Sequence, residues 1–398
     1  MAAKVKMKKI LFYDPDITGH HCEYLHHPAT FLVNQTEVEG VIVCNAKIGA
    51  ELIEIYGENC PQLRIELIQE NLQESIDQAD SLWRRGQADA RCFAFYIEKH
   101  RPDMAIALHA NPMQPFLNGG AFRRCKTRMR GILFDPFPLA ERIAPNERTW
   151  KWRVTAFRKM CQIKWLSLNS RIEKLFVLND TKVTQHFNAL TGKRGLFEAI
   201  PDPLPLHLAH ASSIDSGEED TRVLRLLFIG SINRRKGLLE TLNAIERLPA
   251  PVRARVSLRI VGRFLDTALR EEAVKRVESL SRMGCKIDLC EGWVTDQQFS
   301  EEMVRCDVVL APYVGFHGSS GVIGHAAFYR KPLLATCEGL VGELVHDRQI
   351  GVVVQTRDPE KYADAIDGFM TREWNYASQQ AKYASEMSSS SFIRQLIS

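Results

Sequence analysis

The sequence predicts two α/β domains, each built on a doubly wound parallel sheet. The chain has 398 residues, which is enough for two hydrophobic cores of ordinary size. Short runs rich in Ile, Val, Leu and Phe alternate with longer stretches of helical period, as expected for β-α-β units. This alternation stops in a stretch rich in Pro, Ser and acidic residues, 201–221, and then starts again. Such a stretch is typical of a linker between domains.

The strands and helices are predicted in order along the chain. In the first half, five apolar runs predict buried strands, at 8–14, 38–44, 102–109, 130–135 and 173–179. Segments 21–32 and 71–100 have the spacing of helices. Six further runs predict the second sheet, at 223–230, 255–262, 285–290, 306–313, 331–336 and 351–355.

These elements divide the chain into four parts. We expect a first Rossmann-like domain over 1–205, a linker over 206–221, a second Rossmann-like domain over 222–370, and a helical tail over 371–398 that packs back on the first domain. Ligands of doubly wound sheets bind at the carboxyl ends of the strands. The simplest architecture therefore has two domains that face each other across a ligand-binding cleft.

The composition indicates a globular protein of the cytosol. Apolar residues make up 45% of the chain and charged residues 25%. No run of eighteen apolar residues occurs, and the first apolar patch is too short for a signal peptide. Ten cysteines occur without a CxxC pair or a zinc-like spacing, which favours free thiols in a reducing compartment.

A loop of small residues follows the predicted strand at 306–313 and opens a helix in "GSSGVIGHAAFY". Glycine lets the backbone approach an anion closely, and the first-turn amides carry the positive end of the helix dipole. The candidate residues for a diphosphate cradle are Gly318, Ser319, Ser320, Gly321 and Val322. The alternative is a tight strand-to-helix turn with a serine cap and no ligand.

A second loop could supply positive charge to the same anion. The second domain opens with "LLFIGSINRRKGLLE", a strand that ends in glycine before a basic turn and a helix. Lys236, with Arg234 or Arg235 beside it, would then neutralise a diphosphate at the sheet edge. The alternative is a solvated basic turn.

Four motifs of the second half together resemble retaining glycosyltransferases of the GT-B fold, family-4 type. These are "FIGSINRRKG", "GWVTDQQFSEEMVRCDVVLAPY", "GSSGVIGHAAFYRKPLLAT" and "EGLVGELVHDRQIGVVV". The resemblance implies that the second domain binds a nucleotide-diphosphate sugar and that the first binds the acceptor. It also implies sugar transfer in glycan, polysaccharide or glycolipid synthesis without a cofactor or a metal, because the departing phosphate takes the acceptor's proton.

The first half resembles the family more loosely. "DPDITGHHCEYL" is similar to the family's glycine-bearing loop, which implies that Gly19 lies near the phosphates or the reacting sugar. Because they follow Gly19, His20 or His21 is expected near the acceptor. "DMAIALHANP" is similar to the strand that delivers an active-site histidine, here His109, which would position the sugar. A structural histidine is the alternative for His109.

The sequence departs from the family at two glutamates that flank the phosphate loop. His317 and His325 stand at those positions, one on the side of the donor sugar and one on the side of the ribose. Neutral imidazole offers one acceptor and one donor where a carboxylate offers acceptors only. Ser231 also replaces an arginine common in the family, so the remaining positive charges are those of Lys236 and its neighbours. We take His109, Lys236 and His317 as candidate catalytic residues, and Arg235 and His325 as donor-binding residues.

No metal site is expected. His20, Glu23 and His27 would share one helical face, but the pair of histidines at i and i+4 that is typical of zinc sites is absent. The acidic "DPD" at 14–16 is interpreted as a turn around Pro15.

Positive charge is concentrated between Arg123 and Lys174, where fourteen Lys/Arg occur with four Asp/Glu, and this excess indicates an anionic partner. Within it, 150–168 predicts a basic helix with one apolar face: Trp150, Val154, Phe157, Cys161, Trp165 and Leu168. We favour a face that packs on the core. The second interpretation is peripheral contact with anionic lipid, in which case the acceptor would be lipid-linked. No nucleic-acid module is recognisable, so nucleic acid is not an expected partner.

Two other function classes stay open. A non-catalytic nucleotide-sugar-binding protein would explain the loss of both glutamates, and an epimerase could use the same fold. A phosphorylase would need a lysine that holds pyridoxal phosphate, for which the sequence gives no signal. An NAD-dependent dehydrogenase is disfavoured because no GxGxxG follows the first strand.

Overall fold

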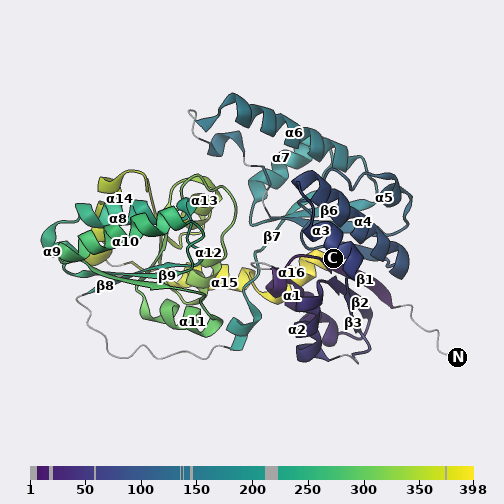
Figure 1. The fold of residues 1–398 in the computed structure, drawn as a ribbon, viewed down its shortest axis with the longest axis horizontal. Helices are drawn as coiled ribbons and strands as arrows, with labels where there is room; N and C mark the ends of the chain where they lie inside the picture. The colour runs from purple at the N-terminus through teal and green to yellow at the C-terminus, as the bar shows by residue number, and fades with distance from the viewer. Residues whose placement is uncertain are drawn as a thin grey trace. The chain divides into compact units, whose positions relative to one another are not determined.

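The computed structural model describes residues 7–17, 21–57, 60–134, 136–137, 139–143, 147–210, 223–372 and 374–398. It divides into two compact units (Figure 1). The first unit comprises Met1–Ala140, Ala144–Leu206 and Ser389–Ser398, and the second comprises Glu141–Ile143 and His207–Ser388. The expected linker begins with a short 3-10 helix, Leu206–His210, and its residues 211–221 lie outside the described residues.

In the described residues, the first unit contains a seven-stranded parallel sheet in the order β3-β2-β1-β4-β5-β6-β7. Its strands are β1 (Lys8–Asp14), β2 (Val38–Cys44), β3 (Leu63–Leu67), β4 (Met104–Ala107), β5 (Arg128–Leu133), β6 (Ile172–Leu178) and β7 (Phe197–Ile200). All five predicted strands are confirmed. The two that were not predicted, β3 and β7, form the two edges of the sheet.

Helices cover both faces of this sheet. They are α1 (His21–Val33), α2 (Ala46–Tyr56), α3 (Glu70–Asp77), α4 (Leu82–His100), α5 (Gly120–Arg124), α6 (Trp150–Ser167), α7 (Thr181–Thr191) and α16 (Ser389–Ile397). Leu11 and Tyr13 of β1 belong to one apolar core, whereas Ile10 and Phe12 belong to the other. Because successive side chains of a strand point to opposite faces, a fully apolar β1 requires a core on each side.

The prediction of a single helix over 71–100 is wrong, because this segment forms two helices, α3 and α4. Ser81 is the N-cap of α4 in an extended conformation, and its hydroxyl accepts a hydrogen bond from the backbone nitrogen of Arg84 at 3.3 Å. A serine that caps a helix satisfies an amide that would otherwise have no partner. The helical period on both sides of Ser81 had concealed this start.

In the described residues, the second unit contains a six-stranded parallel sheet in the order β10-β9-β8-β11-β12-β13. Its strands are β8 (Leu224–Ile229), β9 (Val256–Gly262), β10 (Lys286–Glu291), β11 (Val308–Ala311), β12 (Leu333–Thr336) and β13 (Gly351–Val354), which confirms all six predictions. Its helices are α8 (Leu238–Arg247), α9 (Ala250–Arg253), α10 (Thr267–Arg282), α11 (Asp296–Arg305), α12 (Gly321–Phe328), α13 (Gly339–Asp347), α14 (Pro359–Thr371) and α15 (Ala377–Glu386). Figure 1 shows α8 and α10 on one face of this sheet and α11 on the other.

The expected tail is divided between the units. Helix α15 packs on α12 in the second unit, whereas α16 packs on α1 and β7 in the first.

In both sheets the strand order reverses once, between β1 and β4 in the first and between β8 and β11 in the second. Doubly wound sheets bind ligands at such reversals, outside the carboxyl ends of the strands.

Candidate functional site

The candidate diphosphate cradle lies where the strand order of the second sheet reverses. Strand β11 ends at Ala311, and the loop that follows leads into α12, with Ser320 as the N-cap. The Ser320 side chain makes no capping hydrogen bond to α12, and its Oγ lies 2.7 Å from Tyr313 Oη instead. The amides of Gly321 and Val322, in the first turn of α12, are therefore not capped by this side chain. An uncapped first turn favours an anion.

Lys236 joins this cradle from the neighbouring strand. It ends the 3-10 turn that follows β8, Arg234–Lys236, and its Nζ donates a hydrogen bond to Tyr313 Oη at 2.7 Å. The ammonium also lies 4.4 Å from the centre of the Tyr313 ring. Because an ammonium can only donate, Tyr313 Oη accepts from Lys236, and its own O–H can donate to Ser320 Oγ. Hydrogen bonds from Lys236 to Tyr313 and between Tyr313 and Ser320 thus connect the two loops.

The two neighbouring arginines differ in their surroundings. The guanidinium of Arg235 lies 5.5 Å from the Phe316 ring centre, and the Arg235 carbonyl accepts a hydrogen bond from Val314 N at 2.9 Å. Arg234 instead pairs with Asp266 at 3.4 Å and Glu272 at 3.6 Å. The structure therefore brings Arg235 and Lys236 to the loop that precedes α12, whereas Arg234 forms ion pairs with Asp266 and Glu272.

Gly237 allows the two loops to approach each other. Its φ is +77°, and a Cβ there would lie 1.9 Å from the carbonyl oxygen of Pro312. We expect Gly237→Ala to lower the free energy of unfolding by roughly 2–5 kcal/mol, because strain at positive φ adds to a clash with backbone. Urea unfolding would measure this.

Gly368 provides the matched control, because it lies in α14 with open space around it. Gly368→Ala is expected to stabilise by about 0.5–1 kcal/mol. Equal stability of the two variants would contradict the close approach at Gly237.

The two histidines that flank the cradle contact different helices. His317 lies against the start of α13, because a Cβ on Gly339 would be 3.0 Å from His317 Cα and 3.2 Å from its Nδ1. His325 lies on α12, where its ring centre is 4.5 Å from that of Phe299 and its Nδ1 is 3.2 Å from the Gly321 carbonyl oxygen. Burial, and then the neighbouring His207, lowers the pKa of His325 to about 4. At neutral pH His325 is therefore uncharged.

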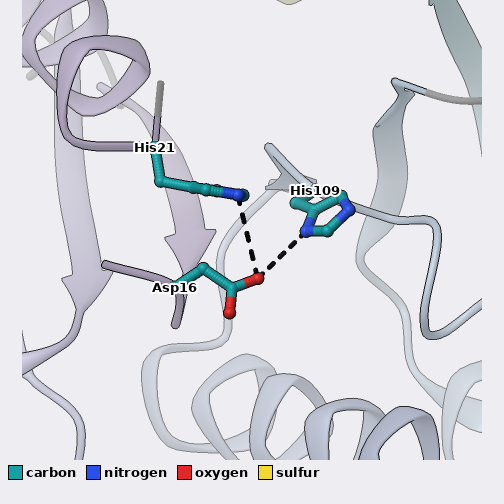
Figure 2. A group of neighbouring side chains, drawn as sticks. All are labelled: Asp16, His21 and His109. Carbon is teal, nitrogen blue, oxygen red and sulfur yellow. Dashed lines mark hydrogen bonds and ion pairs between the residues drawn. The ribbon is translucent and has the colours of Figure 1, made fainter. Parts of the chain in front are cut away.

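A second cluster lies at the corresponding edge of the first sheet, where β1 and β4 end (Figure 2). His109 follows β4, and its Nδ1 lies 3.0 Å from Asp16 Oδ2. His21 begins α1, with its Nδ1 2.8 Å from Asp14 Oδ2 and its Nε2 4.0 Å from Asp16 Oδ2. Arg85 of α4 also donates to Asp16. His109 Nε2 has no hydrogen bond to a described residue, so it could contact a ligand.

Burial and ion pairing oppose each other in this cluster. Burial tends to raise the pKa of Asp16, but the hydrogen bond from His109 and the charge of Arg85 outweigh it and lower that pKa. Burial also raises the pKa of Asp14, which the hydrogen bond from His21 partly offsets. Burial would lower the pKa of His21, but its bond to Asp14 outweighs this and raises it. Asp16 therefore stays ionised and holds the His109 ring.

The sequence predicted His109 but missed the residues that hold it. Asp14 ends β1 rather than opening a turn, Asp16 N donates to Asp14 Oδ1 at 3.1 Å, and each of the two carboxylates contacts a histidine. Gly19 and His20 lie outside the described residues.

The metal set considered from the sequence was His20, Glu23 and His27. Glu23 accepts a hydrogen bond from Leu206 N, and His27 lies beside Ser389. Asp16, His21 and His109 have ligand atoms within 4.8 Å of one another, but Asp16 is already paired with Arg85.

The apolar face predicted for 150–168 does not pack on the core, so the favoured interpretation was wrong. Trp150 and Phe157 are each 70% exposed, and Val154 is 57% exposed. The opposite face of α6 covers an apolar pocket of about 140 Å³, lined by Phe137, Leu139, Trp152, Ala156, Ile163 and Phe187 among others. The helical periodicity predicted the position of α6 correctly, but it predicted the wrong face to be buried.

None of the described helices combines the length and apolar character needed to cross a membrane.

Part of the chain matches a known family. Residues 224–372, which include the cradle and Lys236, match the model described as glycosyl transferases group 1. No curated protein sequence matches the chain.

Solved structures resemble nearly the whole chain. The N-terminal domain of Candida albicans trehalose-6-phosphate phosphatase aligns with a TM-score of 0.71 at 12% identity, over 100% of this chain and 98% of that one. Anabaena HepE, crystallised with UDP-glucose, aligns with a TM-score of 0.63 at 15% identity, over 98% of each chain. WaaG, a glycosyltransferase involved in lipopolysaccharide biosynthesis, aligns with a TM-score of 0.63 at 14% identity, over 95% of each. The family match over 224–372 and the fold shared along the chain confirm the resemblance to GT-B glycosyltransferases of group 1.

Proposed function

We propose that the protein transfers a sugar from a nucleotide-diphosphate donor to an acceptor hydroxyl with retention of configuration, in the synthesis of a glycan, polysaccharide or glycolipid. The observation that carries this proposal is the chain of Lys236, Tyr313 and Ser320 beside the first turn of α12. It combines a positive charge, a hydroxyl and first-turn amides that the Ser320 side chain does not cap, at the reversal of the sheet. These are the groups that a diphosphate requires.

The chemistry assigned to these residues is stabilisation of the leaving group. As the glycosidic bond breaks, negative charge grows on the diphosphate, and the ammonium of Lys236 and the amides of Gly321 and Val322 would stabilise that charge. Donors fixed in advance lower the barrier because they need no reorganisation during the reaction. The departing phosphate would then take the acceptor's proton, and no residue of the chain is needed as an obligate base. His109, held by Asp16, would position the sugar.

The exposed face of α6 favours a lipid-linked acceptor. Trp150, Val154 and Phe157 are exposed on the same helix as the exposed cations Lys151 and Arg158. Apolar side chains interspersed with cations fit the interface of an anionic membrane. The apolar pocket beneath α6 would accommodate part of an acyl chain.

A non-catalytic nucleotide-sugar-binding protein is the second candidate function. The observation that favours it is the state of His325, which is uncharged at neutral pH and packs on Phe299. It therefore cannot reproduce the two acceptor oxygens of a carboxylate. The two functions differ in product, because only a transferase releases free nucleotide diphosphate when it is given donor and acceptor.

Thermal unfolding with UDP-, GDP- and ADP-sugars tests donor binding. We expect one nucleotide class to stabilise the protein, by about 2.7 kcal/mol when the ligand is at 100 times its Kd. His325→Ala is expected to weaken that stabilisation, whereas Lys275→Ala, at an exposed position on α10, should not. No stabilisation by any class at millimolar concentration would contradict the donor site.

A further inference from the structure

A cluster of thiol, imidazole and carboxylate side chains connects α1 to α2, and none of its residues belongs to either candidate site. Cys22 and His26 are four residues apart on α1, so they share one helical face, and Glu51 faces them from α2. Cys22 Sγ lies 3.6 Å from His26 Nε2 and 3.4 Å from Glu51 Oε2. His26 Nε2 lies 3.5 Å from Glu51 Oε1. The thiol, the imidazole and the carboxylate therefore lie together, and one ligand atom from each lies within 4.8 Å of the other two.

The distance between the Cys22 sulfur and the His26 nitrogen matches one edge of a zinc tetrahedron. Zinc binds sulfur at about 2.3 Å, imidazole nitrogen at about 2.0–2.1 Å and carboxylate oxygen at about 2.0–2.2 Å. At tetrahedral angles these bond lengths place the ligand atoms roughly 3.3–3.7 Å apart. The 3.6 Å between Cys22 Sγ and His26 Nε2 falls in this interval. The Glu51 carboxylate contacts both atoms, with one oxygen 3.4 Å from Sγ and the other 3.5 Å from Nε2. A carboxylate, an imidazole and a thiol can thus hold one ion with little movement.

The surroundings of His26 also fit a metal ligand. Its Nδ1 lies 3.2 Å from Tyr56 Oη, and that hydroxyl lies 2.8 Å from Thr30 Oγ1. A hydrogen bond to one ring nitrogen fixes the tautomer and leaves the other nitrogen to bind the ion, as in most histidine metal sites. The His26 side chain is only 12% exposed, so its ring is held in this orientation.

We propose that Cys22, His26 and Glu51 bind one thiophilic divalent cation, best matched by Zn²⁺, with water at the fourth position. Binding converts the Cys22 thiol to a thiolate, so one Zn–S bond forms and one proton is released to solvent. Because one proton is released per ion bound, affinity should increase with pH.

A bound ion would stabilise the first turn of α1. Cys22 directly follows His21, whose ring pairs with buried Asp14. A metal shared by α1 and α2 would anchor the first turn of α1 and so steady the His21 ring. The site is independent of the proposed glycosyl transfer, and it can be tested without donor or acceptor.

Titration of the full-length, chelator-treated protein with Co²⁺ tests the site. We expect the visible bands of tetrahedral cobalt and a thiolate-to-cobalt charge-transfer band, which saturate at one equivalent and are displaced by Zn²⁺. Cys22→Ser should abolish the charge-transfer band. Cys60→Ser is the matched control, because that thiol is also partly buried but lies near Gln62 rather than in the cluster. The spectrum of octahedral cobalt, or identical spectra for wild type and Cys22→Ser, would overturn the proposal.

Two further variants keep the test valid if Cys22→Ser fails to fold. Tyr56→Phe removes only the hydroxyl that orients His26, so it should weaken Co²⁺ binding about 10–100-fold and retain the charge-transfer band. Zn²⁺ should also protect Cys22 from a maleimide in wild type and lose this effect in His26→Gln. Equal protection in wild type and His26→Gln would show that His26 is not a ligand.

Discussion

Replacing Lys236 with methionine is expected to lower kcat/KM for glycosyl transfer by about 10²–10³-fold, the usual cost of removing one donor that stabilises a developing anion. Methionine keeps the apolar stem and removes the ammonium. Tyr313 would retain its hydrogen bond with Ser320 but lose the charge that Lys236 places 2.7 Å from its oxygen. Because the diphosphate carries more charge in the transition state than in the bound donor, kcat should fall more than KM rises.

Release of free nucleotide diphosphate measures this effect, with the nucleotide class that stabilises the wild-type protein. Lys275→Met is the matched control, since it removes a lysine from an exposed position on α10. Tyr313→Phe separates the charge from the hydroxyl chain, and it should cost less than Lys236→Met because the ammonium remains. A Lys236→Met variant with unchanged kcat/KM would contradict the assignment of Lys236 to the leaving group.

The interior strands could be predicted from the sequence because the fold buries both of their faces. Ile10 to Tyr13 in β1 are each fully buried, so this strand appears as an uninterrupted apolar run. The edge strands lack that signal. In β7 only Phe197 and Ile200 are buried, and in β3 only Leu63 is. Such short strands at a sheet edge look like loops in a single sequence.

The candidate sites could be predicted only where their residues lie close together in the sequence. The small residues from Gly318 to Val322 are contiguous, so the sequence by itself offers them as a candidate anion site, with a ligand-free turn as the alternative. The partner that connects Lys236 to this loop is Tyr313, 77 residues away, and only the parallel pairing of β8 with β11 brings them together. Asp16 and His109 are likewise 93 residues apart. Periodicity also cannot tell which apolar face of α6 packs on the protein, because packing depends on partners outside the helix.

Acid is expected to destabilise the first unit through His27. This ring is fully buried between α1 and α16, where its Nδ1 lies 2.9 Å from Ser389 Oγ, and its Nε2 has no hydrogen bond among the described residues. Burial, and then the charge of His26, lowers the pKa of His27 to about 3. The unfolded chain binds a proton near pH 6.5, whereas the folded state does not until about pH 3. The free energy of unfolding should therefore fall as pH falls through this interval, by up to about 4 kcal/mol.

Hydrogen exchange of the amides in α1 and α16 measures this loss in the first unit alone. His27→Gln removes the titrating group, so exchange in these helices should depend less on pH between 6.5 and 4 than in wild type, even if the variant is less stable at neutral pH. His186→Gln on α7 is the matched control, because that histidine is exposed and should leave the pH dependence unchanged. Asp14 and His21 titrate in the same unit, but they are common to all three proteins and cancel in the comparison. Identical pH dependence in wild type and His27→Gln would mean that acid acts through those groups rather than through the contact between α1 and α16.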